Sequence, residues 1–332
     1  MQRASSWFIH VCVNSVKLVS FALGALAIAA MASACAREYS NPQEQSASQS
    51  DSISITISVP YKVKTLDFFI YRDSLNRPLE SHFRLNDEKG KNERDNASGI
   101  EEGKSAELFE ERGEKMNAEA GQKPGKAAGQ EQSKANFKLP SSRGSKIIIA
   151  IANSPYEFNL KALQCFDSAE LLTMYYRDEN PQFPLMSAIS FSDENSISLN
   201  LKALLCPVKV LSISNSTDKL LSHPRLSLRK INASAEMLRS DGFRPSITID
   251  SPAEISHPQM MFSQLPFDLG YDTCHPMTTL YCYPQDAETS LGTPKTEIVL
   301  SAEVDGSTQQ YATPLPKAGR GETIVINLNI CP

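Results

Sequence analysis

The sequence lacks the motifs that place a nucleotide, a catalytic serine, calcium or zinc on a known scaffold. No P-loop, G-x-G-x-x-G, G-x-S-x-G, H-E-x-x-H or EF-hand pattern occurs in its 332 residues. Histidine is scarce, with five residues, and none accompanies a nucleophile-elbow serine. His275 follows Cys274 directly, but no second pair has zinc-ligand spacing. The sequence therefore predicts a protein that is not an enzyme and holds no cofactor or metal. A hydrolase would need two carboxylates that converge in one cleft.

An excess of basic residues is also absent. The chain has 33 Lys and Arg against 38 Asp and Glu, which gives a formal net charge of −5. Nucleic-acid binding through a basic surface is therefore not expected.

Only one long stretch is free of charge, and it lies near the N-terminus. Arg3, His10 and Lys17 precede an uncharged run from residue 18 to residue 36, and its last part reads "AMASACA". A basic segment, an apolar segment and small residues are typical of a signal peptide. Small residues immediately before Cys35 resemble the lipobox of bacterial lipoproteins, in which the cysteine is acylated and becomes the first residue. We expect a signal peptide over 1–34 and lipidation, with palmitate-type chains, at Cys35.

Two alternatives stay open for this segment. The signal could be cleaved in the ordinary way near Ala34, which would make Cys35 incidental. The 19 uncharged residues would also just suffice for a retained membrane anchor, although eight of them are alanine.

The signal peptide and Cys35 account for two of the seven cysteines, which leaves an odd number. Cys274 and Cys282 flank the segment "HPMTTLY" and could close a short disulfide loop in an exported protein. Two small buried residues on neighbouring strands are the alternative.

Polar composition marks two segments that we expect to be flexible. Residues 35–51 include "REYSNPQEQSASQSD", which reads as a stalk. Residues 88–134 hold 9 basic and 11 acidic residues among 47, with very few large apolar ones. Such a segment buries too little apolar surface to offset the entropy of ordering it, so we predict a disordered insertion in a surface loop.

The remaining sequence has the pattern of short β-strands. "SISITISV" from Ser52 alternates polar and apolar residues, "KIIIAIA" from Lys146 is continuously apolar, and "ETIVINLNI" from Glu322 alternates again. Asp305 and Gly306 mark a hairpin turn. Many short strands with almost no helical period predict an all-β fold of sandwiches. We expect an N-terminal domain over 52–205 and a C-terminal domain over 206–332.

Several segments together resemble the Bacteroidales fimbrillin superfamily. They are the Cys35 lipobox, "TLDFFIYRDSLNRPLESHFRL", "KIIIAIANSP", "YRDENPQFPLMSA", "INASAEMLRSDGFRP" and "LYCYPQDAETSLGTPKTEIVLSAEVDGSTQQYATP". Within the superfamily the chain is most similar to FimB-like anchor and accessory lipoproteins. The resemblance covers residues 52–329 apart from the charged insertion.

The resemblance implies two tandem transthyretin-like β-sandwich domains and a role in fimbrial assembly. Pilin subunits of this family polymerise by inserting a strand of one subunit into a groove of the next, after a trypsin-like protease that cuts behind arginine has removed an N-terminal strand. The expected partners are thus fimbrillin-type pilin subunits, and the lipid bilayer through acylated Cys35. Arg37 is the only basic residue between Cys35 and the first strand, so it is the protease-sensitive site that would sever the tether. The strand from Ser52 would be exchangeable, and the strand from Glu322 would be the donor or closing strand.

The expected location is the outer membrane and the cell surface or fimbrium. The expected function is that of a lipid-anchored fimbrial anchor or accessory subunit. A surface lipoprotein that binds glycan or a host protein through its sandwich loops is the alternative.

Overall fold

A computed structural model gives the fold of the chain and describes residues 51–86, 133–239, 248–285 and 295–331. Within these ranges the regular secondary structure is almost entirely β-strand, which confirms the predicted all-β sandwich class. A four-residue helix, α2 (Phe166–Ala169), and three short 3₁₀ segments interrupt the strands: η1 (Tyr176–Asp178), η2 (Pro252–Glu254) and η3 (Pro258–Met260). Contacts group Ser50–Pro332 as one compact unit, so the division into domains at residue 206 stays a prediction.

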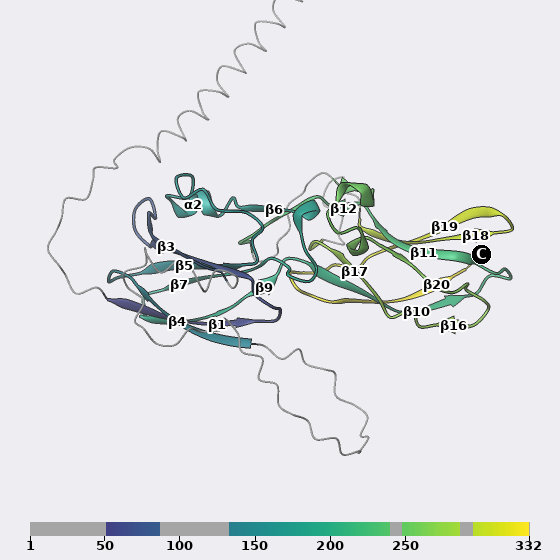
Figure 1. Ribbon diagram of the computed structural model, residues 1–332, viewed down its shortest axis with the longest axis horizontal. Helices are drawn as coiled ribbons and strands as arrows, with labels where there is room; N and C mark the ends of the chain where they lie inside the picture. The colour runs from purple at the N-terminus through teal and green to yellow at the C-terminus, as the bar shows by residue number, and fades with distance from the viewer. Residues whose placement is uncertain (1–50, 87–132, 240–247, 286–294, 332) are drawn as a thin grey trace, which may run out of the picture. The chain divides into compact units, whose positions relative to one another are not determined.

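The first half of this unit forms a five-stranded sheet and a three-stranded sheet (Figure 1). The five-stranded sheet has the order β3 (Leu79–Asn86), β2 (Thr65–Arg72), β5 (Lys146–Ala152), β7 (Met186–Ser192) and β9 (Lys202–Ala203). The three-stranded sheet has the order β4 (Ser133–Pro140), β1 (Ser52–Val59) and β8 (Ser196–Asn200). Apolar side chains of both sheets share one buried cluster, so the two sheets pack face to face as a sandwich.

The second half contains two four-stranded sheets. In one, β10 (Cys206–Asn215) pairs with β16 (Thr273–Cys274), β17 (Thr278–Cys282) and β20 (Ile324–Ile330). The other has the order β15 (Phe262–Gln264), β11 (Ser222–Arg229), β18 (Glu297–Val304) and β19 (Ser307–Pro314). Two short pairs complete the described strands: β12 (Ile231–Asn232) with β14 (Thr248–Ile249), and β13 (Ser234–Glu236) with β6 (Thr173–Tyr175).

The sequence patterns explain where the main strands lie. All seven residues of β5 are buried, as expected for a continuously apolar strand in the middle of a sheet that is covered on both faces. In β1 and β20 buried and outward-facing residues alternate, which fits strands with one core-facing side. Asp305 and Gly306 join β18 to β19 with φ angles of 51° and 77°, which confirms the predicted hairpin.

The helix α2 is confined to Phe166–Ala169, and Tyr175 belongs to β6, because pairing with β13 satisfies the backbone there. One local expectation needs correction. The predicted insertion 88–134 ends too late, since Ser133 and Lys134 already pair with β1; its residues 88–132 lie outside the described part.

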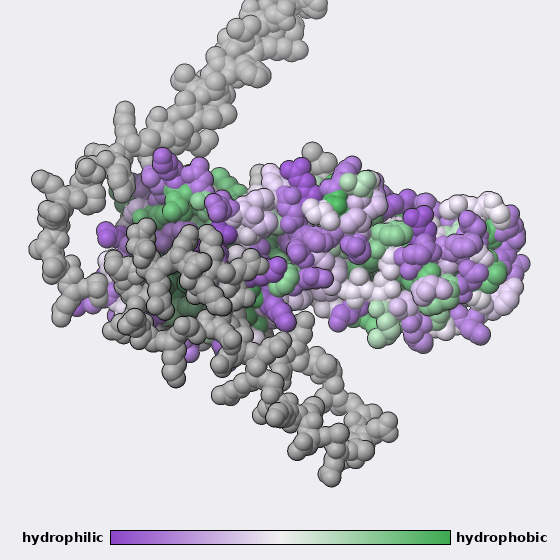
Figure 2. All heavy atoms as spheres, in the orientation of Figure 1, coloured by the Kyte–Doolittle hydropathy of each residue, from purple (hydrophilic) through white to green (hydrophobic). Residues whose placement is uncertain are grey.

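Some large hydrophobic side chains of the described residues are exposed, among them Leu75, Leu171 and Met277. On the face seen in Figure 2, small hydrophobic patches are separated by hydrophilic residues. No helix in the described ranges is long and apolar enough to cross a membrane. In those ranges, no group of three His, Cys, Asp or Glu residues could hold a metal ion.

Candidate functional site

The middle strand of the three-stranded sheet is the first described strand, β1. It pairs antiparallel with β4 over all eight of its residues, from Ser52 opposite Pro140 to Val59 opposite Ser133. On its other side it pairs in parallel with five residues of β8. Both hydrogen-bonding edges of β1 are therefore occupied by its own chain.

The side chains of β1 that face the core are deeply buried. Ile53, Ile55, Ile57 and Val59 are each at most 2 % exposed. They pack in one cluster with side chains of the facing sheet, including Leu66 of β2. Burial of each such branched side chain contributes about 1.5–3 kcal/mol to stability. Loss of β1 would consequently open an apolar groove between β4 and β8.

Strand β4 depends on β1 for its place. Within the part of the chain that the structure describes, β1 is the only strand that pairs with β4. Residues 87–132 precede β4 along the chain and lie outside that part. A strand that replaced β1 would therefore have to pair antiparallel with β4 and in parallel with β8.

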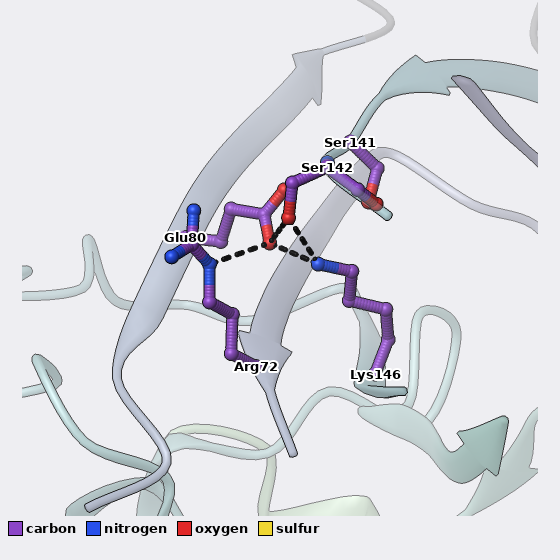
Figure 3. Close-up of polar contacts among 5 residues, drawn as sticks. All are labelled: Arg72, Glu80, Ser141, Ser142 and Lys146. Atoms are coloured by element: carbon purple, nitrogen blue, oxygen red, sulfur yellow. Dashed lines mark hydrogen bonds and ion pairs between the residues drawn. The ribbon is translucent and has the colours of Figure 1, made fainter. Parts of the chain in front are cut away.

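A buried polar cluster fastens the connection from β4 to β5 beside the start of β1 (Figure 3). The carboxylate of Glu80 on β3 is its centre and pairs with the ammonium of Lys146, whose side chain is 3 % exposed. Ser142 donates to Glu80 through its backbone N–H at 2.5 Å and through its hydroxyl at 2.9 Å. Arg72 Nε lies 3.4 Å from the same carboxylate.

The same connection holds Asp51, the residue before β1. The backbone N–H of Ser141 donates to the Asp51 carbonyl at 2.9 Å, and Arg143 pairs with the Asp51 carboxylate. Burial alone would raise the pKa of Glu80, but hydrogen bonds from Lys146 and Ser142 outweigh it and lower that pKa. The Glu80 carboxylate therefore stays ionised, and the cluster ties the entry of β1 to both sheets.

The exit of β1 is fastened as well. Asn153, which follows β5 with a φ of 60°, accepts a hydrogen bond from the Lys64 backbone N–H at 2.8 Å. Its side-chain amide donates to the Lys62 carbonyl, also at 2.8 Å. The Lys64 ammonium lies 4.0 Å from the ring centroid of Phe183. The two lysines that follow β1 thus lie in a bonded connection between β1 and β2.

The last strand, β20, lies at the edge of its sheet. It pairs in parallel with β10, and no other described strand pairs with it. Ile324, Ile326, Leu328 and Ile330 are buried, while the residues between them are exposed. Four alternating apolar side chains also define the core side of β1, so the two strands present the same pattern.

A buried carboxyl group directly follows η1. Glu179 is 1 % exposed, and its oxygens accept hydrogen bonds from the Tyr283 hydroxyl and the Leu185 backbone N–H, each at 3.3 Å. Burial raises the pKa of Glu179 to about 8. The group is therefore mainly protonated at neutral pH.

The predicted site residues have different outcomes. Cys35 and Arg37 lie outside the described residues, so lipidation and cleavage there stay predictions. The Cys274–Cys282 disulfide also stays a prediction. The strand register does not place these two residues opposite each other, because Cys274 lies opposite Ile213 of β10 whereas Cys282 lies opposite Cys206, seven residues away on the same strand.

The sequence prediction missed the Glu80–Lys146 cluster. The available signal was a lysine as the first residue of an otherwise continuously apolar strand, where a cation needs a partner. Nothing in the spacing identified Glu80 as that partner.

No family model matches the chain, and no curated protein sequence matches it. Several solved structures do. One, described as a candidate cell-adhesion protein of Parabacteroides distasonis, has a TM-score of 0.52 and 8 % identity, over 83 % of this chain and 88 % of that one. A second, described in the same way from Bacteroides eggerthii, has a TM-score of 0.51 and 9 % identity, over 86 % and 88 %. A fimbrial assembly protein of Parabacteroides distasonis has a TM-score of 0.48 and 11 % identity, over 83 % of this chain and 90 % of that one.

At these identities the likeness is one of fold. The chain has the fold of the two candidate cell-adhesion proteins from Parabacteroides distasonis and Bacteroides eggerthii.

Proposed function

We propose that this chain is a lipid-anchored fimbrial anchor or accessory subunit of the outer membrane. Acylated Cys35 holds it on the bilayer at the cell surface, and strand addition joins it to fimbrillin-type pilin subunits. Main-chain hydrogen bonds give such an interaction its affinity, and alternate side chains in pockets give its specificity.

The observation that carries the proposal is that β1 fills its own groove and has no arginine at which it could be removed. Between Arg37 and Arg72 the sequence contains no arginine. A cut after Arg37 severs the lipid tether but leaves β1 in place, and a cut after Arg72 would divide the fold at β2. The chain accordingly keeps β1 and accepts no donor strand, which suits a subunit at the end of a fimbrium.

The open edge and alternating pattern of β20 suit the donor role. In the proposed contact, β20 leaves β10 and enters the empty groove of a pilin, where its four apolar side chains are buried again. Because one apolar groove replaces another, the exchange costs little in buried area. A subunit that donates a strand without accepting one ends the polymer at the membrane.

The test is a Cys35→Ala substitution in cells that make this protein, followed by fractionation and electron microscopy. We expect fimbriae in the medium with the variant at their base. The matched control is Cys331→Ala, which alters an exposed cysteine after β20 and should leave fimbriae on the cells. If Cys35→Ala cells keep normal fimbriae while the protein alone leaves the membrane, the fimbrial assignment fails.

A further inference from the structure

Two cysteines face each other at one end of the β10–β17 pair. Cys206 is the first residue of β10, Cys282 is the last residue of β17, and the antiparallel register places them directly opposite each other. Residues opposite each other in such a pair have Cα atoms about 4.5–5.5 Å apart. A disulfide needs a Cα separation of about 4.4–6.8 Å. The backbone therefore already has the spacing that a cross-link requires.

The two side chains also contact each other. Both residues are fully buried in the core. A hydrogen bond with the Cys206 side chain and burial raise the pKa of the Cys282 thiol well above its ordinary value. The thiols therefore share one site without solvent.

Oxidation would leave the Gly319 carbonyl with a hydrogen-bond partner. The Cys206 thiol donates to the Gly319 carbonyl at 3.0 Å. That carbonyl also accepts a hydrogen bond from the Glu322 backbone N–H at 3.2 Å. When Cys206 loses its proton, the carbonyl keeps this second donor.

The other described cysteines lie elsewhere. Cys165 lies within hydrogen-bond distance of Ser168, at 3.1 Å between Sγ and Oγ, and Cys274 lies opposite Ile213. Cys331 directly follows β20 and is exposed. Among the described cysteines the strand register brings only Cys206 and Cys282 face to face.

We propose that Cys206 and Cys282 form a disulfide that joins β10 to β17. The oxidant is a disulfide compound: both thiols lose their protons and one electron each, one S–S bond forms, and the oxidant is reduced to two thiols. Since the folded site is closed to solvent, the bond forms while the chain folds. The structure describes five cysteines, so one disulfide leaves the other three reduced.

The disulfide would lie next to contacts between the segment around Cys282 and the segment around η1. The residues on either side of Cys282 meet the segment around η1: the Tyr176 hydroxyl donates to the Tyr281 carbonyl at 2.7 Å, and Tyr283 donates to Glu179. A bond from Cys206 to Cys282 fixes the strand that carries these contacts. It would resist separation of β17 from β10 whether or not the chain takes part in fimbriae.

The test uses the full chain, unfolded and reduced, and then refolded in a mixture of reduced and oxidised glutathione. Remaining thiols are alkylated under denaturing conditions, and the digest is analysed by mass spectrometry. We expect a peptide pair joined through Cys206 and Cys282, with loss of alkylation at both, while Cys165, Cys274 and Cys331 are alkylated. Alkylation of both Cys206 and Cys282, or a pair that joins Cys282 to Cys274, would overturn the proposal.

Variants provide an independent measurement. Dithiothreitol should lower the urea midpoint of the wild-type chain and of Cys274→Ser, but not that of the Cys206→Ser/Cys282→Ser double variant. An unchanged wild-type midpoint would count against the cross-link. The peptide map needs no variant, so it stays decisive if the double variant fails to fold.

Discussion

At the scale of single residues, Lys146 and Glu80 are the charged pair on which the connection beside β1 depends. Their side chains are 3 % and 12 % exposed. A buried charge without its partner is costly, so each residue is needed chiefly because the other is present. Arg72 contacts the same carboxylate from the surface, with a side chain that is 56 % exposed.

Replacement of Lys146 by methionine should therefore lower the free energy of unfolding by about 3–5 kcal/mol, because Glu80 loses its buried cationic partner and keeps only Arg72, which contacts it from the surface. Urea denaturation at neutral pH measures the change. Arg72→Met is the matched control and should cost at most about 1 kcal/mol. Equal losses of unfolding free energy in the two variants would show that the buried Lys146 contributes no more to stability than the exposed Arg72.

Protonation of Glu80 gives the same cluster a pH dependence. Because the pKa of Glu80 in the folded state lies below its ordinary value of 4.5, its contribution to stability is present above that value. It is lost as the pH falls through the folded-state pKa. Lys146→Met should reduce this acid-side loss in urea denaturation curves taken at falling pH, because only Ser142 and Arg72 then favour the ionised carboxylate.

Glu179 should act in the opposite direction. Its pKa is about 8 in the folded state against an ordinary value of 4.5. Between these values the unfolded chain has lost a proton that the folded chain keeps, so stability falls as the pH rises from about 4.5 to 8. Glu179→Gln should remove this slope in denaturation curves taken across that range. Glu170→Gln, at an exposed position, should keep it; a slope that survives in Glu179→Gln would contradict the assignment.

At the scale of elements, the account rests on β1 as a strand held from both sides. Ile57→Ala should lower the free energy of unfolding by about 2–5 kcal/mol, since its side chain is fully buried between two sheets. Ser54→Ala changes an exposed side chain on the same strand and should alter stability by less than about 0.5 kcal/mol. Comparable effects in the two variants would mean that β1 is not seated in the core.

The matched test for β20 compares Leu328 with Val325. Leu328→Ala removes a buried side chain and should lower both stability and the amount of pilin that copurifies with the chain. Val325→Ala alters a side chain that is 55 % exposed and should change neither. If both variants retain pilin equally, β20 is not the donor.

The alternating patterns made β1, β20 and the Asp305–Gly306 hairpin predictable, because each depends on neighbours in sequence. The partners of β1 were not predictable in the same way. Strand β4 begins at Ser133, after a segment of charged residues, and its pairing with β1 spans about 80 positions of sequence. The Cys274–Cys282 pairing was predicted from closeness in sequence, whereas the strand register places Cys206 opposite Cys282.

At the scale of the whole molecule, the all-β class followed from composition and strand period. Contacts of the fold cross the domain boundary that the sequence predicts at residue 206. Buried apolar residues from before and after this position, such as Tyr176 and Tyr283, belong to one cluster. Pairing of β6 with β13 also crosses it. Such long-range contacts are set by tertiary packing, which local sequence patterns do not encode.

In the proposed role, the mature protein must keep β1. The most direct measurement is the intact mass and N-terminal peptide map of the protein isolated from the outer membrane with its fimbriae. The account predicts an N-terminus at acylated Cys35 and an unbroken peptide that contains residues 52–59. A mature chain that starts after Val59 would contradict it, because the groove between β4 and β8 would then be open to a donor strand.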